Sequence, residues 1–237
     1  TNIFTQGNGV AWNGTRWVAV GEGTNTIAYS SNGQNWIGLG NNIFSTSGRG
    51  VAWNGTRWVA AGQGSNTIAY SDDGITWIGL ENNIFSTSGY GVAWNGSKWV
   101  AMGSGTTNTI AHSDDGITWT GLGNTIFSTY GKGVAWNGTI WVAVGSGTTN
   151  TIAYSYDGQN WIGLGSNIFS TSGNGVAWNG TRWVAVGSGN DNSIAHSTDG
   201  IHWSGVEDSS TNYFTYGRGV AWNGTRWLAV GYGTYSI

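Results

Sequence analysis

The stretch GVAWNGTRWVA at residues 9–19 decides the fold of this 237-residue chain. Its first six residues, GVAWNG, recur five times, with copies that start at Gly50, Gly91, Gly133, Gly175 and Gly219. The intervals are 41, 41, 42, 42 and 44 residues, and residues 9–49 and 50–90 are identical at 32 of 41 positions. A period of this length indicates a repeat architecture in which each unit buries its apolar faces against its neighbours.

Each repeat predicts four short strands. In the first repeat these are residues 10–12, 16–20, 26–30 and 35–39. Asn13-Gly14 between the first two strands predicts a type I′ hairpin turn, because both central residues of that turn need positive φ. A second tight turn is expected at Asn32-Gly33. No segment shows a 3.6-residue apolar period, so we expect essentially no helix.

Four antiparallel strands in about 42 residues predict an all-β protein, a β-propeller built of four-stranded blades. We expect one domain over residues 1–237, and the repeats span 9–49, 50–90, 91–132, 133–174, 175–218, and a partial unit of 219–237 with 1–8. Ile237 aligns with Ile27, so six blades are expected, with the last one lacking most of its outer two strands. Five blades are an alternative. A parallel β-helix competes less well because its rungs are shorter and lack Asn-Gly hairpins.

The turn before the fourth strand repeats in five copies, for example Ser71-Asp72-Asp73-Gly74-Ile75-Thr76-Trp77. It resembles the Asp-box, or bacterial neuraminidase repeat, of sialidase-type propellers, whose pattern is Ser-x-Asp-x-Gly-x-Thr-Trp. One residue is missing here between Asp and Gly. The resemblance implies a structural turn away from any catalytic face, and the turn residues are Asn32, Asp73, Asp115, Asp157 and Asp199. The small propeller of Trp- and Gly-rich blades is also similar to tachylectin-like propeller lectins.

Composition argues against several classes of partner. Eight Lys and Arg residues and a pI near 5.4 argue against nucleic acid. No apolar run of about 18 residues is present, which argues against membrane insertion. The chain has no Cys, so a disulfide or a Cys-based metal site is impossible. Calcium needs several convergent carboxylates and each turn offers one or two, so we expect neither a metal nor a cofactor. No signal peptide is recognisable, and the compartment is left open.

The sequence favours a binding protein over an enzyme. A catalytic site breaks repeat symmetry, whereas the charged residues here fall mostly at equivalent positions of the repeats. Glycosidase chemistry needs two carboxyl groups across one bond, and the odd acidic pair, Glu207 and Asp208, is interpreted as part of a solvated loop. We therefore predict a non-enzymatic, multivalent, lectin-like module with weak equivalent sites between blades.

Two repeated positions supply the candidate ligand-binding residues. The entry to the second strand carries Arg16, Arg57, Lys98, Arg182 and Arg226, and a position between blades carries Arg49, Tyr90, Lys132 and Arg218. The competing interpretation is that these residues are charges on the rim of the ring. Alternatives to a lectin are a structural protein that self-associates through the incomplete sixth blade, and an engineered repeat scaffold without a ligand.

The Trp residues are expected to form the core. Trp12 and Trp17 should share one face of the sheet across the hairpin. Replacing Trp36 with Ala should cost about 3–5 kcal/mol, as for a buried aromatic side chain.

Overall fold

The computed structural model describes residues 2–233, and the alignment expected for Ile237 lies outside them. The chain divides into two compact units, residues 1–123 and 124–237, which are described separately. The single domain expected from the sequence stays a prediction.

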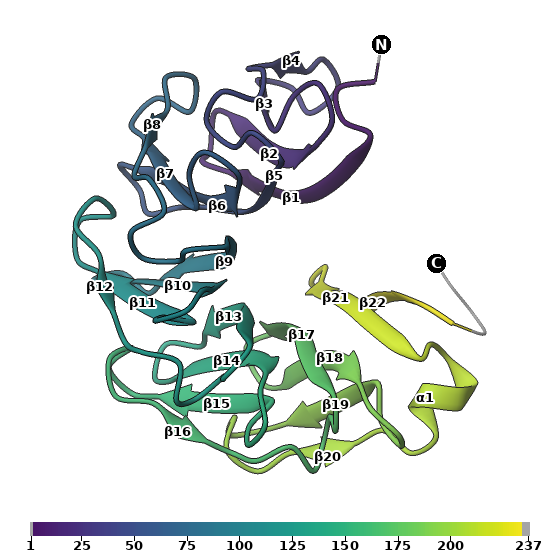
Figure 1. Ribbon diagram of the computed structural model, residues 1–237. Coiled ribbons are helices and arrows are strands. Elements are labelled where there is room, and N and C mark those ends of the chain that lie inside the picture. The colour runs from purple at the N-terminus through teal and green to yellow at the C-terminus, as the bar shows by residue number, and fades with distance from the viewer. Residues whose placement is uncertain (1, 234–237) are drawn as a thin grey trace. The chain divides into compact units, whose positions relative to one another are not determined.

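The first unit contains three antiparallel four-stranded sheets, one for each repeat (Figure 1). Their strands are β1 (Gln6–Trp12), β2 (Trp17–Glu22), β3 (Ile27–Ser30), β4 (Ile37–Gly38); β5 (Ser47–Trp53), β6 (Trp58–Gln63), β7 (Ile68–Ser71), β8 (Ile78–Gly79); β9 (Ser88–Trp94), β10 (Trp99–Ser104), β11 (Ile110–Ser113) and β12 (Thr120–Gly121). Single residue pairs, Glu22 with Ser47 and Gln63 with Ser88, join one sheet to the next.

The second unit contains two further four-stranded sheets and a hairpin within the described residues (Figure 1). Their elements are β13 (Tyr130–Trp136), β14 (Trp141–Ser146), β15 (Ile152–Ser155), β16 (Ile162–Gly163); β17 (Ser172–Trp178), β18 (Trp183–Ser188), β19 (Ile194–Ser197), β20 (Ser204–Gly205); the one-turn helix α1 (Ser209–Asn212); and β21 (Tyr216–Trp222) with β22 (Trp227–Tyr232). The all-β class and the four-stranded repeat are confirmed, and α1 is the exception to the expected absence of helix.

The prediction of a type I′ turn at Asn13-Gly14 is wrong. Trp12 pairs with Trp17, which leaves a four-residue loop, and Gly14 has a φ of 98° whereas Asn13 does not have positive φ. The Asn13 carboxamide oxygen accepts hydrogen bonds from the backbone N–H groups of Thr15 at 2.9 Å and Arg16 at 2.6 Å. This local side-chain capping replaces the two-residue turn.

Alternating side chains of the second strand hold neighbouring blades together. On β6, Trp58 and Ala60 pack against Val18 and Val20 of the preceding blade. Val59 points the other way, into the cluster that contains Trp99 of the following blade. Because successive strand residues face opposite sides, each second strand contributes to two interfaces. Trp58, Trp99, Trp141 and Trp183 are completely buried.

The Trp pairs across the hairpins lie together as expected, but Trp12 is 40% exposed and does not belong to the core. The rings of Trp12 and Trp17 lie 4.9 Å apart, and each of the five equivalent pairs lies 5.0 to 5.2 Å apart. The expectation that Trp36 is fully buried is wrong, because its side chain is half-buried. Its equivalent Trp77 is buried against the preceding blade, but Trp119 and Trp203, which also follow a blade in their units, are half-buried like Trp36.

Substitution of Trp58 by Ala should therefore lower the free energy of unfolding by about 3–5 kcal/mol, since it removes a completely buried indole. Trp36→Ala should cost less than half as much, and urea denaturation of both variants measures the difference. Equal costs for the two variants would contradict the assignment of the core to the second strand.

A glycine turn packs on the buried indole. Gly74 has a φ of 75°, and a Cβ added there would lie 3.0 Å from Trp58 Nε1 and 3.1 Å from Val18 Cγ2. Gly40 also has a φ of 75°, but a Cβ there would meet nothing within 4 Å. The two glycines thus share a backbone conformation and differ in the space around them.

Gly40→Ala should cost about 1–2 kcal/mol for its left-handed backbone. Gly74→Ala should cost roughly 1–3 kcal/mol more, because it also overpacks the interface between blades. The midpoints of chemical unfolding of the two variants provide the test. A Gly74→Ala variant no less stable than Gly40→Ala would show that the turn does not contact the indole tightly.

Candidate functional site

The Asp turns organise the outer edge of the sheets. The Asp73 carboxylate accepts hydrogen bonds from the backbone N–H groups of Ile75 at 2.8 Å and Thr76 at 2.7 Å. The hydroxyl of Ser71 donates to it at 3.0 Å. Asn32 forms the same turn with a neutral side chain, since its Oδ1 accepts from the N–H of Gln34 at 3.0 Å. The geometry therefore depends on the oxygen acceptor and not on a bound ion.

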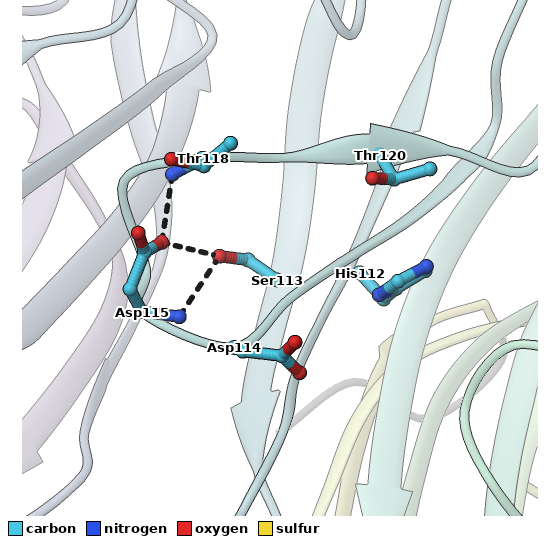
Figure 2. Close-up of a pocket in the computed structure, with 6 residues that line it drawn as sticks. All are labelled: His112, Ser113, Asp114, Asp115, Thr118 and Thr120. Carbon is cyan, nitrogen blue, oxygen red and sulfur yellow. Dashed lines mark hydrogen bonds between the residues drawn. The ribbon is translucent and has the colours of Figure 1, made fainter.

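Figure 2 shows this turn in the third repeat, where it borders a hollow of about 200 Å³. Asp115 accepts from Ser113 Oγ at 2.9 Å and from the Thr118 N–H at 2.7 Å, so its carboxylate is engaged by its own turn. His112 and Thr120 line the hollow in the slots that Tyr29 and Ile37 fill in the first repeat. The third repeat is thus more polar here than the first.

Hydrogen bonding makes these carboxyl groups strongly acidic. Burial alone would raise the pKa of Asp73, but the two backbone amides and the Ser71 hydroxyl outweigh it and lower that pKa to about 2. The pKa of Asp115 is lowered to about 2 for the same reasons. Burial would also raise the pKa of Asp157, but hydrogen bonds from the backbone and side chain of Asn160 lower it. The pKa of Asp199 is lowered mainly by a hydrogen bond from the side chain of His202.

Acid should therefore destabilise the protein. The pKa of an unfolded Asp is about 3.9, so a folded pKa near 2 gives stability that is present above pH 4 and lost as the pH falls from 4 toward 2. Asp73→Asn should keep the turn, as Asn32 does, and weaken this pH dependence. Unfolding midpoints between pH 6 and 2 measure the effect, and Asn32→Asp should strengthen it. Identical pH profiles for the unaltered protein and the two variants would show that the turn carboxylates do not cause the loss of stability in acid.

The second-strand cations connect neighbouring blades. Arg57 donates from Nη1 to the backbone oxygen of Asp115 in the next blade at 2.9 Å, and its Nε lies 2.7 Å from the Asp72 carboxylate. Its guanidinium also lies 4.9 Å from the centre of the Tyr70 ring. Arg16 repeats two of these contacts: it donates to the Asp73 backbone oxygen, and its guanidinium lies 5.3 Å from the centre of the Tyr29 ring. These two predicted ligand-binding residues therefore hold the Asp turn of the following blade.

The other members of this slot differ from one another. Lys98 forms an ion pair with Asp114 at 2.6 Å, which lowers the pKa of that carboxyl group. Arg182 and Arg226 are exposed, and neither forms an ion pair among the described residues. Ile140 occupies the slot in the fourth repeat and is buried. The structure thus gives this slot no common ligand geometry, and ligand binding at it stays a prediction.

The first-strand candidates all occupy a β-bulge. The pairing of β5 with β6 passes from Gly48–Gly62 to Gly50–Ala61, which leaves Arg49 as the extra residue. The same register shift isolates the equivalent residue of every first strand: Asn8, Tyr90, Lys132, Asn174 and Arg218. A bulge redirects a side chain away from the regular alternation of the strand. The repeat therefore presents one variable side chain per blade.

In the first unit the bulge residues contact one another. The Arg49 guanidinium lies 4.9 Å from the centre of the Tyr90 ring, and its Nη2 donates to Gln63 Oε1 at 2.8 Å. Asn8 Nδ2 donates to the backbone oxygen of Gly48 at 2.9 Å. The strands approach so closely that a Cβ on Gly50 would lie 2.7 Å from the Tyr90 backbone oxygen.

In the second unit the bulge residues form a cluster with tyrosines. Lys132 Nζ donates to Asn174 Oδ1 at 2.6 Å and to the hydroxyl of Tyr216 at 2.8 Å. The guanidinium of Arg218 lies 5.3 Å from the centre of the Tyr232 ring. The stacked rings of Tyr216 and Tyr232 thus connect Lys132 on β13 with Arg218 on β21.

A groove opens between the second and third blades of the first unit. It has a volume of about 200 Å³ and is lined by Thr67, Ile68, Leu80, Glu81, Asn83, Ile84, Ile117 and Trp119. The Trp119 side chain is half-buried, and its Nε1 donates to the Gly116 backbone oxygen at 3.2 Å, which fixes the indole plane. The groove therefore offers a held aromatic ring beside polar groups.

Glu81 is an exception in the repeat pattern. It has a φ of 60° at a position where Gly40, Gly123 and Gly165 have φ of 75°, 79° and 80°. Its N–H donates to Asn66 Oδ1 at 2.8 Å, and Asn83 Nδ2 donates to its carboxylate at 3.1 Å. A non-glycine residue in this conformation carries strain of order 1 kcal/mol, and such strain is concentrated at functional sites.

Within residues 2–233 no three His, Asp or Glu side chains are grouped so that they could hold a metal ion. None of the helical segments in the same range is long and apolar enough to cross a membrane.

No protein-family model matches the chain, and no curated protein matches it. Solved structures do resemble it. A chain of the mitotic checkpoint complex aligns with a TM-score of 0.67 at 15% identity, over 94% of this chain and 71% of that one. A chain of a nidogen/laminin complex aligns with a TM-score of 0.64 at 14% identity, over 93% and 83%.

The computationally designed Ika8 protein aligns with a TM-score of 0.64 at 12% identity, over 94% of this chain and 67% of that one. These neighbours include propeller proteins, and together with the repeated four-stranded antiparallel sheets they establish the β-propeller class of this chain. At such low identity the likeness concerns the fold alone.

Sequence reasoning missed Glu81 and Trp119 as groove residues, and it missed the tyrosines around Lys132. The signal available was departure from the repeat. Glu81 stands where three other copies have Gly and the fifth has Glu207, and Tyr130 and Tyr216 stand where three copies have Ser. Residues that depart from the repeat are therefore the candidates for contacts that are specific to one blade.

Proposed function

We propose that this protein is a non-enzymatic β-propeller module that binds carbohydrate in grooves between neighbouring blades. The groove beside Trp119 and Glu81 is the observation that carries the proposal. The half-buried indole supplies a flat apolar surface for the C–H face of a sugar ring, and its hydrogen bond to the Gly116 backbone holds it in place.

The polar groups of the groove suit the hydroxyl groups of a sugar. The Glu81 carboxylate accepts hydrogen bonds, and Asn83 orients it through a bond of 3.1 Å. Thr67 and the amide of Asn83 add further polar atoms to the lining. The volume of about 200 Å³ lies below the ~300 Å³ at which pockets for drug-sized ligands begin. These features favour a single sugar ring with part of its surface in water.

Binding without hydrolysis agrees with the acidic groups present. Glycosidases need two carboxyl groups that flank the scissile bond. Glu81 is the one acidic residue among the described residues that line this groove. The proposed activity is therefore recognition, and related grooves along the repeats would add avidity.

A glycan array probed with labelled protein tests the proposal, followed by calorimetry with the free sugar that competes for binding. Trp119→Ala should weaken binding at least tenfold because it removes the stacking surface. Glu81→Gly should also weaken binding, yet it should preserve or raise stability because it relieves the positive-φ strain.

Two variants serve as matched controls for this experiment. Trp12→Ala removes an exposed indole outside the groove, and Asp191→Asn removes an exposed carboxylate elsewhere. Both should bind as the unaltered protein does. Undiminished binding by Trp119→Ala and Glu81→Gly would exclude this groove as the site, and a blank array at high protein concentration would exclude the proposed function.

A second candidate is an assembly or scaffold protein, and exposed apolar side chains in the terminal repeats favour it. Leu228 on β22 is 55% exposed, whereas Val18 and Val59 in the same slot are completely buried. Val10 on β1 is 57% exposed. The likeness to a computationally designed protein also fits a scaffold without a ligand. A blank array together with a solution mass that grows with concentration would favour a second copy of the chain as the partner.

A further inference from the structure

The singular tyrosines of the second unit gather around its bulge residues. The first position of the first strand is Ser47, Ser88 and Ser172 in three repeats, but Tyr130 and Tyr216 in two others. Tyr232 likewise takes a slot that is Glu, Gln or Ser in the other repeats. Among near-identical blades, these replacements are concentrated at one end of β13, β17 and β21, whose strands pack side by side.

Lys132 is the centre of this group. Its Nζ lies 5.0 Å from the centre of the Tyr130 ring and 5.3 Å from that of Tyr216. It donates to Asn174 Oδ1 and to the Tyr216 hydroxyl, and Asn174 is itself fixed by donating from Nδ2 to the Gly217 backbone oxygen at 2.7 Å. An ammonium group has three N–H donors. Two of them are used, and no hydrogen bond within residues 2–233 engages the third.

A second cation lies on β21, which packs beside β17, the strand next to β13. Arg218 is exposed and its guanidinium lies over Tyr232, whose ring stacks on that of Tyr216 with centres 5.1 Å apart. The ion pairs of the described residues join Arg57 to Asp72, Lys98 to Asp114 and His202 to Asp199. Lys132 and Arg218 take part in none of these pairs, so the positive charge of the cluster is not neutralised by a carboxylate of residues 2–233.

We propose that Lys132, Tyr216 and Arg218 form a binding site for an oxyanion, a carboxylate or a sulfate, carried by a sugar. Neutral hydrogen-bond acceptors and ring faces hold the Lys132 ammonium in position, so little conformational entropy is lost when it meets an anion. The half-exposed ring of Tyr232 adds an apolar surface beside the charge. The sugar part of the inference rests on the proposed function, whereas the anion part rests on this cluster alone.

Isothermal titration calorimetry with four probes tests the site: sodium glucuronate, glucose 6-sulfate, glucose and inorganic sulfate. The two acidic sugars should bind at least tenfold more tightly than glucose, and their affinity should fall as salt is added, since the attraction is electrostatic. Preference for glucuronate or for the sulfated sugar identifies which oxyanion the site takes.

Lys132→Met keeps the length of the side chain and removes its charge, and it should abolish the preference for acidic sugars. Arg218→Met should reduce that preference severalfold. Tyr156→Ala removes an exposed ring elsewhere in the second unit and should leave binding unchanged. Thermal unfolding of each variant separates loss of the site from loss of the fold, and Arg218→Met, at an exposed residue, provides the test if Lys132→Met is unfolded.

The outcomes distinguish this inference from the proposed function. Equal affinity for glucose and glucuronate would overturn the anion site and leave carbohydrate binding at the groove of Trp119 intact. Inorganic sulfate that binds as tightly as glucose 6-sulfate would overturn recognition of a sugar at this cluster. An acidic preference that survives in Lys132→Met would overturn the assignment of the site to these residues.

Discussion

An indole ring packed between two sheets is the contact on which this fold depends. Trp58 fills the space between its own blade and the blade before it, where it meets Val18 and Val20. The turn at Gly74 closes over the same ring, with room for no more than a hydrogen atom in place of a side chain. Because each second strand uses its other face for the next interface, one Trp per repeat connects the blades of a unit in sequence. Low charge content and the absence of Cys and Pro leave this packing and the turn hydrogen bonds as the main sources of stability.

Much of the fold could be predicted from the sequence because its determinants are local and repeated. The second strand expected at residues 16–20 is observed at Trp17–Glu22, and the Trp pairs fall opposite each other. The fourth strand was predicted over five residues and has only two, Ile37–Gly38. The turn at Asn13 differs from its prediction because the carboxamide caps the loop, a competition that a dipeptide signal does not reveal. Burial of Trp36 could not be predicted from its repeat position, because Trp77 at the same position is buried whereas Trp119 and Trp203 are half-buried.

The candidate site was less accessible to sequence reasoning. Lys132 and Arg218 were selected from their repeated position, but Tyr216 lies 84 residues from Lys132 and enters the cluster only through tertiary packing. In the sequence Glu81 is a single substitution in the repeat, and only its φ of 60° shows that it adopts a backbone conformation that favours glycine. Arg16 and Arg57 were selected on charge, and the structure shows that they bind the Asp turn of the next blade. The residues that repeat thus form the scaffold, while the residues that depart from the repeat mark the candidate sites of ligand binding.

The β-bulge of the first strand is a position at which the side chain can vary from repeat to repeat. The bulged residue pairs with no partner across the ladder, so its side chain can change without altering the register of the sheet. Asn, Arg, Tyr and Lys all occupy this position in the chain on nearly identical backbones. A library randomised at these positions alone would vary one side chain in each repeat while the Trp and Gly contacts stay fixed. The repeat therefore combines a constant backbone with one variable bulge residue, and new binding surfaces could be selected by changing that residue.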